Sequence, residues 1–265
     1  MTLSTRSSSL TAVVTLALLA ASPLAGGPSH AQPPAAEGWQ APRTASGKPD
    51  FSGFWTQPVH VNPTGRGATT FTKDKLPPFV PGGDALFYKP HVGDPFVDEP
   101  RAFCMPSGFP SAFFGPYPVQ IVQNDDWLVM TTEFERATRL IPLDGRAHRE
   151  GIEPTYYGDS VGHWEGDTLV IDSRNFKPWT LDDYYYVNPQ EHRMHSDAFR
   201  TIERLSRVDA DTLSYELTVE DSKIFVSSWT ENLEMTLRPE WEKVGLYEFV
   251  CQENNRCPGG DCGKK

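Results

Sequence analysis

The sequence predicts an all-β protein, an antiparallel meander barrel of about eight to nine strands that follows a long N-terminal arm. From Pro118 onward, short stretches alternate apolar and polar residues and are separated by turn signals such as Asp144-Gly145 and Glu165-Gly166-Asp167. Alternation with a period of two is typical of half-buried strands, and tight turns join strands antiparallel. No segment carries the pattern of a long amphipathic helix. Closing the meander into a barrel removes exposed edges, and such a barrel can enclose one small ligand.

The chain begins with the pattern of an export signal. Arg6 precedes an apolar run from Leu10 to Leu24, and Ser29-His30-Ala31 supplies small residues where a signal peptidase reads them. We therefore expect residues 1–31 to be a signal peptide and the mature chain to be periplasmic or secreted. We expect no stable membrane insertion after cleavage, because the apolar run is short. A retained N-terminal anchor is the alternative.

Residues 32–117 form the arm. Prolines are too frequent between residues 56 and 117 for central strands, and the aromatic rings there are too many for a free linker. The alternating stretch 47–55 predicts a short strand or an anchor. We expect the arm to wrap the domain formed by residues 118–265 and to pack its rings onto it. A cover over an active site would show the same composition.

Nine strands are predicted after the arm. They are 119–123, 127–134, 138–143, 160–164, 168–174, 199–208, 212–219, 225–237 and 246–251. The longest connections are 145–159 and 175–198. Long loops on a rigid scaffold are where binding and catalytic residues concentrate.

Four cysteines, an even number, lie in the exported part of the chain, where disulfides persist. We expect Cys104 to pair with Cys251 and Cys257 with Cys262, so that disulfides staple the C-terminus. Other connectivities stay open, because spacing alone does not rank them. A zinc site at Cys257 and Cys262 is a weaker alternative, since no histidine lies beside them.

The balance of charge is strongly acidic. The formal net charge is −11, from 24 basic and 35 acidic residues, and removal of Arg6 with the signal peptide makes it −12 (23 − 35). An acidic surface repels phosphate backbones. We therefore expect no nucleic-acid partner.

Several phrases occur together over nearly all of the mature chain. They are GKPDFSGFW at 47–55, PVQIVQ at 118–123, RLIPLDGRAH at 139–148, GDSVGHWEGDTLVID at 158–172, His195-Ser196 and Glu203-Arg204. Together they resemble a family of exported, mostly uncharacterised bacterial proteins. The resemblance implies a β-rich, lipocalin-like protein of the periplasm or the medium, and it brings no assigned activity. The run Asp182–Asn188 departs from the family pattern and points to a particular substrate.

Four ionisable residues are the candidates for acid–base catalysis. Imidazole groups exchange protons near neutral pH, which favours His148, His163 and His195. Asp172 interrupts the apolar run 169–171, so its carboxylate faces either water, the commoner case, or a cavity that perturbs its pKa.

Aromatic and arginine side chains are the candidates for substrate binding. Rings that suit an apolar or aromatic ligand are Tyr156, Tyr157, Trp164, Tyr184, Tyr185 and Tyr186. Arg139 and Arg200 lie near the phrases shared with the family and could clamp a carboxylate. Their alternative role is an ion pair with a neighbouring glutamate.

No cofactor is expected, because the chain has no phosphate loop, dinucleotide fingerprint or nucleophile elbow. A divalent metal is the alternative. A helical turn at Glu191–Ser196 would point His192 and His195 the same way, and His148 or His163 could complete the set of ligands.

These features favour an exported enzyme, a lyase, hydratase or isomerase that acts by acid–base chemistry on a small aromatic or terpenoid-like compound inside the barrel. A non-catalytic carrier of such a ligand is one alternative. A histidine-metal hydrolase or oxygenase is another, because barrels of this kind host both binding and catalysis.

Overall fold

Antiparallel strands dominate the structure, as the sequence predicts. The computed structural model describes residues 38–60, 71, 75–93, 98, 104–182 and 191–251. The first sheet has the strand order β1-β4-β5-β6. Its strands are β1 (Gly53–Trp55), β4 (Val119–Gln123), β5 (Trp127–Thr132) and β6 (Thr138–Pro142). Because β1 pairs with β4, the family-like stretch 47–55 joins the arm to this sheet.

The second sheet has six strands in the order β2-β13-β12-β11-β8-β7, all antiparallel. Its strands are β2 (Val59–His60), β7 (Asp159–Glu165), β8 (Thr168–Arg174), β11 (Phe199–Arg207), β12 (Thr212–Asp221) and β13 (Trp229–Thr236). The longest hairpins come from the strongest alternation in the sequence, because one face of each strand packs on the core.

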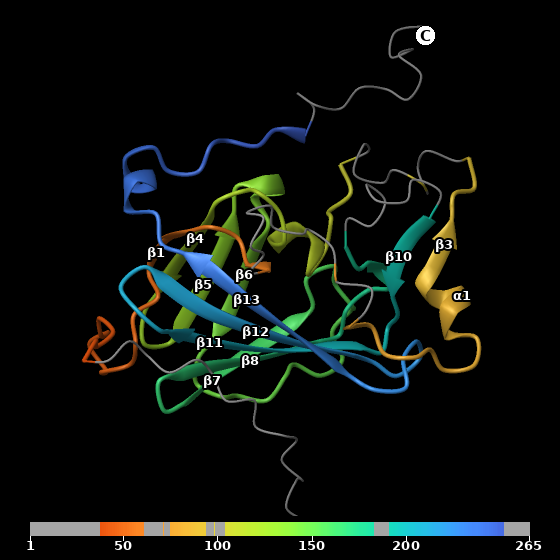
Figure 1. Ribbon diagram of the computed structural model, residues 1–265, viewed down its shortest axis with the longest axis horizontal. Coiled ribbons are helices and arrows are strands. Elements are labelled where there is room, and N and C mark those ends of the chain that lie inside the picture. Colours follow the sequence, from red (N-terminus) through yellow and green to blue (C-terminus); the bar gives the residue numbers. More distant parts are fainter. Residues whose placement is uncertain are drawn as a thin grey trace, which may run out of the picture. The chain divides into compact units, whose positions relative to one another are not determined.

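A third, small sheet has the order β3-β10-β9. Its strands are β3 (Tyr88–Pro90), β9 (Trp179–Thr180) and β10 (Glu191–His195). Helix α1 (Gly83–Phe87) lies beside it (Figure 1). Short 3₁₀ helices in the described residues include η3 (Ser111–Phe113), η4 (Phe134–Arg136) and η6 (Pro239–Lys243).

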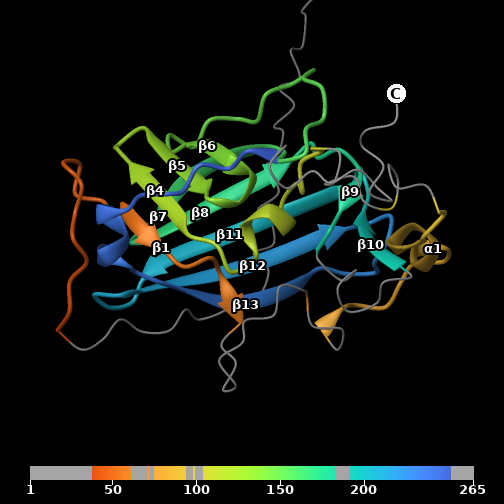
Figure 2. The ribbon, with the colours of Figure 1, turned by 90° about the horizontal axis from the view of Figure 1, so that it is seen from above.

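The two larger sheets lie face to face, and their strands cross at a steep angle (Figures 1 and 2). At one side a bridge joins Trp55 to Leu237, and the amide of Thr56 donates to Thr236. At the other side β6 and β7 are neighbours, and Gly162 allows this approach because a Cβ there would lie 3.0 Å from Leu143. The hydrogen-bonded ladders themselves stay separate. The antiparallel all-β class is therefore confirmed, whereas closure into a barrel stays a prediction.

Aromatic rings from the arm fill the space between these sheets. Trp55, Phe109 and Phe113 are at most 1% exposed, and they pack with inward-facing residues such as Met130 and Leu217 in one core. The arm therefore contributes the centre of the protein, where the sequence suggested a wrapping. Its rings occupy the volume in which a lipocalin-like barrel would hold a ligand.

Arg139 crosses this core and ties the two sheets together. It projects inward from β6 and forms a two-pronged ion pair with Glu203 of β11, with Nη1 2.8 Å from Oε2. Tyr215 of β12 donates its hydroxyl to the same carboxylate at 2.6 Å, and the Phe109 ring lies 4.2 Å from the guanidinium carbon. Burial lowers the pKa of Arg139, but Glu203 and Tyr215 together outweigh burial, so the pKa rises and the guanidinium stays charged. The side chain that the sequence proposed as a substrate clamp is thus engaged inside the core.

One predicted strand, 246–251, is wrong: residues 246–250 are not a strand, because their backbone groups bond to side chains of the β5–β6 connection. Residues 191–195 lie in the predicted loop 175–198. They form strand β10, because they pair with β3 and β9, so the helical turn that would align the two histidines is absent there. Side chains three apart on a strand point to opposite faces. His192 and His195 therefore do not converge.

Candidate functional site

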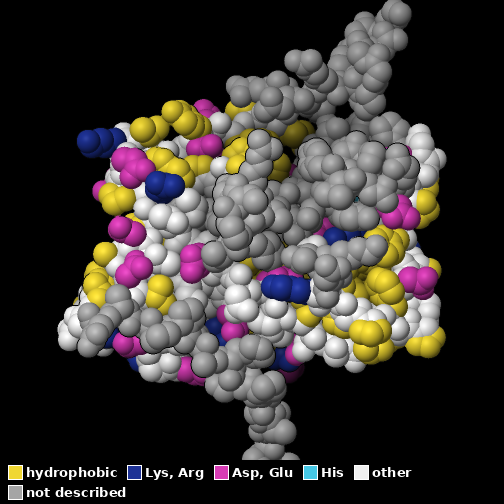
Figure 3. Space-filling view, in the orientation of Figure 1, with side chains coloured by type: hydrophobic (Ala, Val, Ile, Leu, Met, Phe, Trp, Pro, Cys, Tyr) yellow, Lys and Arg dark blue, Asp and Glu magenta, His cyan; other side chains and the backbone are white. Residues whose placement is uncertain are grey.

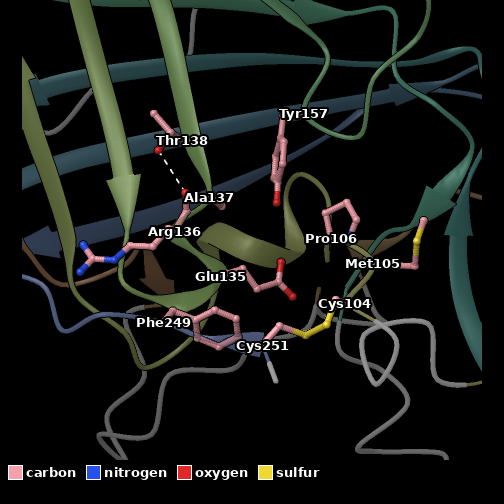
Figure 4. Close-up of a pocket in the computed structure, with 10 residues that line it drawn as sticks. All are labelled: Cys104, Met105, Pro106, Glu135, Arg136, Ala137, Thr138, Tyr157, Phe249 and Cys251. Carbon is pink, nitrogen blue, oxygen red and sulfur yellow. Dashed lines mark hydrogen bonds between the residues drawn. A yellow bond between two sulfur atoms is a disulfide. The ribbon is translucent and has the colours of Figure 1, made fainter. Parts of the chain in front are cut away.

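A cavity of about 400 Å³ opens at the end of the first sheet where β5 turns into β6. Its walls come from residues 104–106, from η4 and the start of β6, from Tyr157 and from the C-terminal residues Phe249 and Cys251 (Figure 4). Cys104 and Cys251 form a disulfide across one wall, which confirms that predicted pairing. Cys257 and Cys262 lie outside the described residues. We name this cavity the Glu135 pocket.

Glu135 is fixed by an unusual backbone and by Ser107. Its φ angle is +57° and that of Arg136 is +50°, in the left-handed region that residues with a Cβ seldom adopt. The amide of Ser107 donates to Oε2 at 2.8 Å, and its hydroxyl donates to Oε1 at 2.7 Å. Residues other than glycine that adopt the left-handed conformation are concentrated at functional sites, where a side chain must be held in one orientation.

Tyr157 faces this carboxylate across the pocket. Figure 4 shows its hydroxyl pointing toward Glu135. Burial raises the pKa of Tyr157 well above its usual value, the nearby Glu135 raises it further, and a hydrogen bond with the Gly108 backbone lowers it only in part. The phenol is therefore a neutral hydrogen-bond donor at physiological pH. A carboxylate and a neutral phenol facing each other form an acceptor and a donor on two sides of one space.

The C-terminal residues close one side of the pocket. We call residues 246–251 the C-terminal strap. Arg136 donates to the carbonyl of Leu246 at 2.7 Å, and the amide of Tyr247 donates to Glu133 at 3.0 Å. The Phe249 ring packs edge-on against Phe134, with centroids 5.6 Å apart. The strap thus presents an apolar ring to the pocket beside the charged groups.

A second constellation joins two of the predicted catalytic residues, His148 and Asp172. His148 Nδ1 lies 3.0 Å from Asp159 Oδ2, and its Nε2 lies 3.5 Å from Asp172 Oδ2. Arg149 and Arg200 pair with the two carboxylates, at 2.7 Å and 2.8 Å. By its register, Asp172 projects from the face of the six-stranded sheet that is turned away from the core. His148 therefore ties the loop 143–158 onto that outer face.

We expect Asp172→Asn to lower stability at neutral pH and to lose this effect in acid. Burial raises the pKa of Asp172, but Arg200 and His148 outweigh it, so its pKa falls below 3.8. A carboxylate whose pKa is lower in the folded state than in the unfolded state stabilises the fold at pH values above its unfolded-state pKa. This contribution disappears as the pH falls through the folded-state pKa. Chemical unfolding at pH 7 should show a loss of roughly 1 kcal/mol, which shrinks below pH 3.8.

Asp197→Asn is the matched control for this change. Asp197 pairs with Lys223 at the surface, where both side chains are more than half exposed. Solvent screens such a pair, so the control should unfold at the wild-type midpoint. An Asp172→Asn variant as stable as wild type at pH 7 would show that the His148 array is not stabilising.

The other predicted catalytic histidines lie elsewhere. His163 is half exposed on β7 and pairs with Glu165 at 3.3 Å. His195 is buried and stacks on Phe199, with centroids 4.2 Å apart. Burial lowers its pKa to about 4, so this ring is neutral at physiological pH, and its Nε2 meets no hydrogen-bond partner among the described residues. The structure thus joins His148 with Asp172 and separates both from His195.

The predicted binding residues are divided in the same way. Tyr157 lines the Glu135 pocket, whereas Tyr156 packs edge-on against Trp179 at 4.8 Å. Trp164 packs against Phe51 of the arm. Arg200 belongs to the His148 array. Tyr184, Tyr185 and Tyr186 lie outside the described residues.

The predicted metal ligands do not converge in the structure. His192 stacks on His91, with ring centroids 4.6 Å apart, far from the partners of His148 and His163 described above. Within the described ranges, no group of three or more His, Cys, Asp or Glu side chains is placed to hold a metal ion.

Sequence reasoning missed Glu135 and Ser107. Among the neighbouring glutamates that could pair with an arginine, Glu135 was given no role in a site. One signal was available: the connection 133–137 is short and lacks glycine, and hairpin connections of this length commonly need a left-handed residue. A left-handed residue beside a cavity is worth inspecting for function.

Comparison with known proteins adds no relative. No protein-family model matches the chain, and no curated protein matches its sequence. In the part of the chain that the structure describes, no helix is long and apolar enough to cross a membrane.

Proposed function

We propose that the protein is an exported enzyme that moves protons on a small, partly apolar compound in the Glu135 pocket. A lyase, hydratase or isomerase that needs no cofactor fits this chemistry. The observation that carries the proposal is the Glu135–Tyr157 pair, a fixed carboxylate opposite a neutral phenol in a cavity of about 400 Å³. Cavities of this size are typical of small-molecule sites.

The two groups divide the work. Glu135 removes a proton from carbon next to a carbonyl, and the electron pair of that C–H bond moves toward the carbonyl oxygen. Tyr157 donates a hydrogen bond to this oxygen as negative charge builds on it. The proton held by Glu135 then passes to a leaving hydroxyl in a lyase, or to another carbon in an isomerase. Both steps balance without an oxidant or a reductant.

The lining supports a ligand with an apolar body. Met105, Pro106 and Phe249 provide apolar surface in the pocket wall. Aromatic and terpenoid-like compounds that carry one carbonyl or hydroxyl suit a pocket with both apolar and polar lining residues. Export is supported by the disulfide and by the N-terminal pattern.

A lipocalin-like barrel is part of the proposal, with the ligand at its mouth and not at its centre. Support comes from the two sheets, which approach each other at both sides, and from the rings of the arm, which fill the interior. Acidic side chains are scattered over the described part of the face shown in Figure 3, and this accords with a small-molecule ligand in preference to nucleic acid.

Hydrogen–deuterium exchange of substrate protons tests the proposal. Purified mature protein is incubated in D₂O with a panel of aromatic and terpenoid hydroxy-ketones, and exchange or turnover is followed by NMR. We expect Glu135→Gln to slow exchange about 10²–10⁴-fold and Tyr157→Phe to slow it by a similar factor. Both substitutions keep the size of the side chain, so the pocket should still bind the compound.

Glu133→Gln is the matched control. Glu133 lies in the same connection but accepts from Tyr247 of the strap, and an amide oxygen can accept the same bond. Its rate should equal that of wild type. A Glu135→Gln variant with the full rate would refute the proposal. Binding of a compound without any exchange in wild type would instead identify a carrier.

A further inference from the structure

A second cavity of about 430 Å³ lies at the opposite end of the first sheet. Ser46 of the arm bonds at 2.6 Å to Asp125 in the β4–β5 turn, which fixes the arm at this end. The Glu135 pocket lies at the other end, in the β5–β6 connection. The walls of the second cavity come from residues 39–43 and Pro49 of the arm, from Asp167 and Thr168, and from residues 206–208. We name it the Trp39 pocket.

Its aromatic wall is Trp39, which packs beside a partly buried cation, Arg207. The guanidinium of Arg207 lies between the Trp39 and Trp55 rings, at 5.7 Å and 5.3 Å from their centroids. It also donates to the carbonyl oxygens of Asp50 and Ala210. Its Nε is buried and meets no hydrogen-bond partner in the part of the chain described here. The wall therefore offers a flat aromatic ring whose position is fixed by the guanidinium beside it.

Its polar wall offers donors and acceptors in matched pairs. Arg43 and Asp167 form a two-pronged ion pair with bonds of 2.6 Å and 2.7 Å. The hydroxyls of Thr168 and Ser206 lie 3.0 Å apart on neighbouring strands, and either can donate. A hydroxyl group of a ligand both donates and accepts, so it can bond to each of these pairs.

The charges of the pocket argue against an ionic ligand. Arg43 is already paired with Asp167, and the field at Arg207 includes Asp50, Asp209 and Asp211. A compact anion would meet these carboxylates, and a cation would meet the two guanidinium groups. A neutral molecule with many hydroxyls avoids both costs.

We propose that the Trp39 pocket binds a saccharide of one or two sugar rings. The C–H face of a sugar ring packs on the electron-rich face of Trp39, and its hydroxyls bond to the Arg43–Asp167 and Thr168–Ser206 pairs. The cavity is large enough for such a ligand by the usual range of small-molecule sites. This site is separate from the Glu135 pocket and does not depend on the enzyme proposed there.

Calorimetry and saturation-transfer NMR on the mature, oxidised protein test this proposal, with glucose, maltose, cellobiose and galactose as probes. We expect saturable binding of at least one of them with a Kd of about 1 mM. Trp39→Ala should weaken that binding at least tenfold, and Ser206→Ala should weaken it less. Trp241→Ala is the matched control, because Trp241 also lies beside an arginine, Arg238, at a different surface.

Three results would overturn the proposal: no saturable binding of any probe up to about 50 mM, wild-type affinity in Trp39→Ala, or binding of sulfate or benzoate in place of the sugars. The Glu135→Gln variant should bind the sugar as wild type does. The test of saccharide binding is therefore independent of the test of the enzyme proposed at the Glu135 pocket.

Discussion

Replacement of Arg139 by methionine is expected to lower the free energy of unfolding by about 3–5 kcal/mol. The change leaves the carboxyl group of Glu203 fully buried and without both guanidinium bonds. Tyr215 would remain as a donor to the carboxylate, but one neutral hydroxyl does not replace a cation. Small domains are stable by roughly 5–15 kcal/mol, so the loss is a large share of the total. Urea unfolding followed by tryptophan fluorescence measures it.

The double variant Arg139→Met with Glu203→Gln tests the cause of this loss. It replaces the unpaired carboxyl group by a neutral amide, so it should be more stable than the single variant, even if the single variant does not fold. Arg204→Met is the control, on strand β11 next to Glu203, because its partner Glu165 is half exposed and the pair is screened. A single variant within about 1 kcal/mol of wild type would show that the buried pair does not hold the sheets together.

Two strands, β4 and β8, have the predicted bounds. β4 alternates between buried and less buried residues, whereas β8 is an apolar run that begins after a Glu-Gly-Asp turn. Strand β10 was not predicted, because its sequence pattern also fits a helical turn. It forms a strand by pairing with β3 of the arm, which is distant from β10 in the sequence. The periodicity of apolar residues indicates local geometry, and it does not indicate a pairing strand that is distant in the sequence.

It was harder to predict which face of the sheet a side chain lies on than to predict the bounds of the strand that carries it. Residues 168–171 of β8 are buried on both faces, and only the next residue, Asp172, is partly exposed. The apolar run therefore did not reveal which face was the core. The register shows that Asp172 lies opposite Val161 and Ile202, on the outer face. The loop that carries His148 covers this face, which explains why Val170 is buried there.

The candidate site was only partly visible in the sequence, for a related reason. Tyr157 and the Cys104–Cys251 pair could be nominated from residue type. Glu135 could not, because its importance comes from a left-handed backbone and from two bonds to Ser107, which no local pattern encodes. Arg139 shows the converse: its side chain could bind a ligand carboxylate, but it is buried in the core and bonded to Glu203.

Replacement of both Cys104 and Cys251 by serine is expected to lower stability by about 2–5 kcal/mol and to open the Glu135 pocket. The disulfide joins residues 147 positions apart, and a cross-link over so long a loop restricts the unfolded chain strongly. Both cysteines also line the pocket, so their separation frees loop 104–108 from the strap. Thermal unfolding of the variant and of wild type measures the first effect.

Amide hydrogen exchange measures the second effect at named positions. The amide of Ser107 donates to Glu135, and that of Tyr247 donates to Glu133. Both should exchange faster in the double-serine variant, because the disulfide no longer holds loop 104–108 and the C-terminal strap together and local opening becomes easier. The amides of Ile121 and Met130, in the β4–β5 ladder, should keep wild-type protection relative to global stability. Equal protection of Ser107 in both proteins would mean that the left-handed turn and the bonds from Ser107 hold Glu135 without the disulfide.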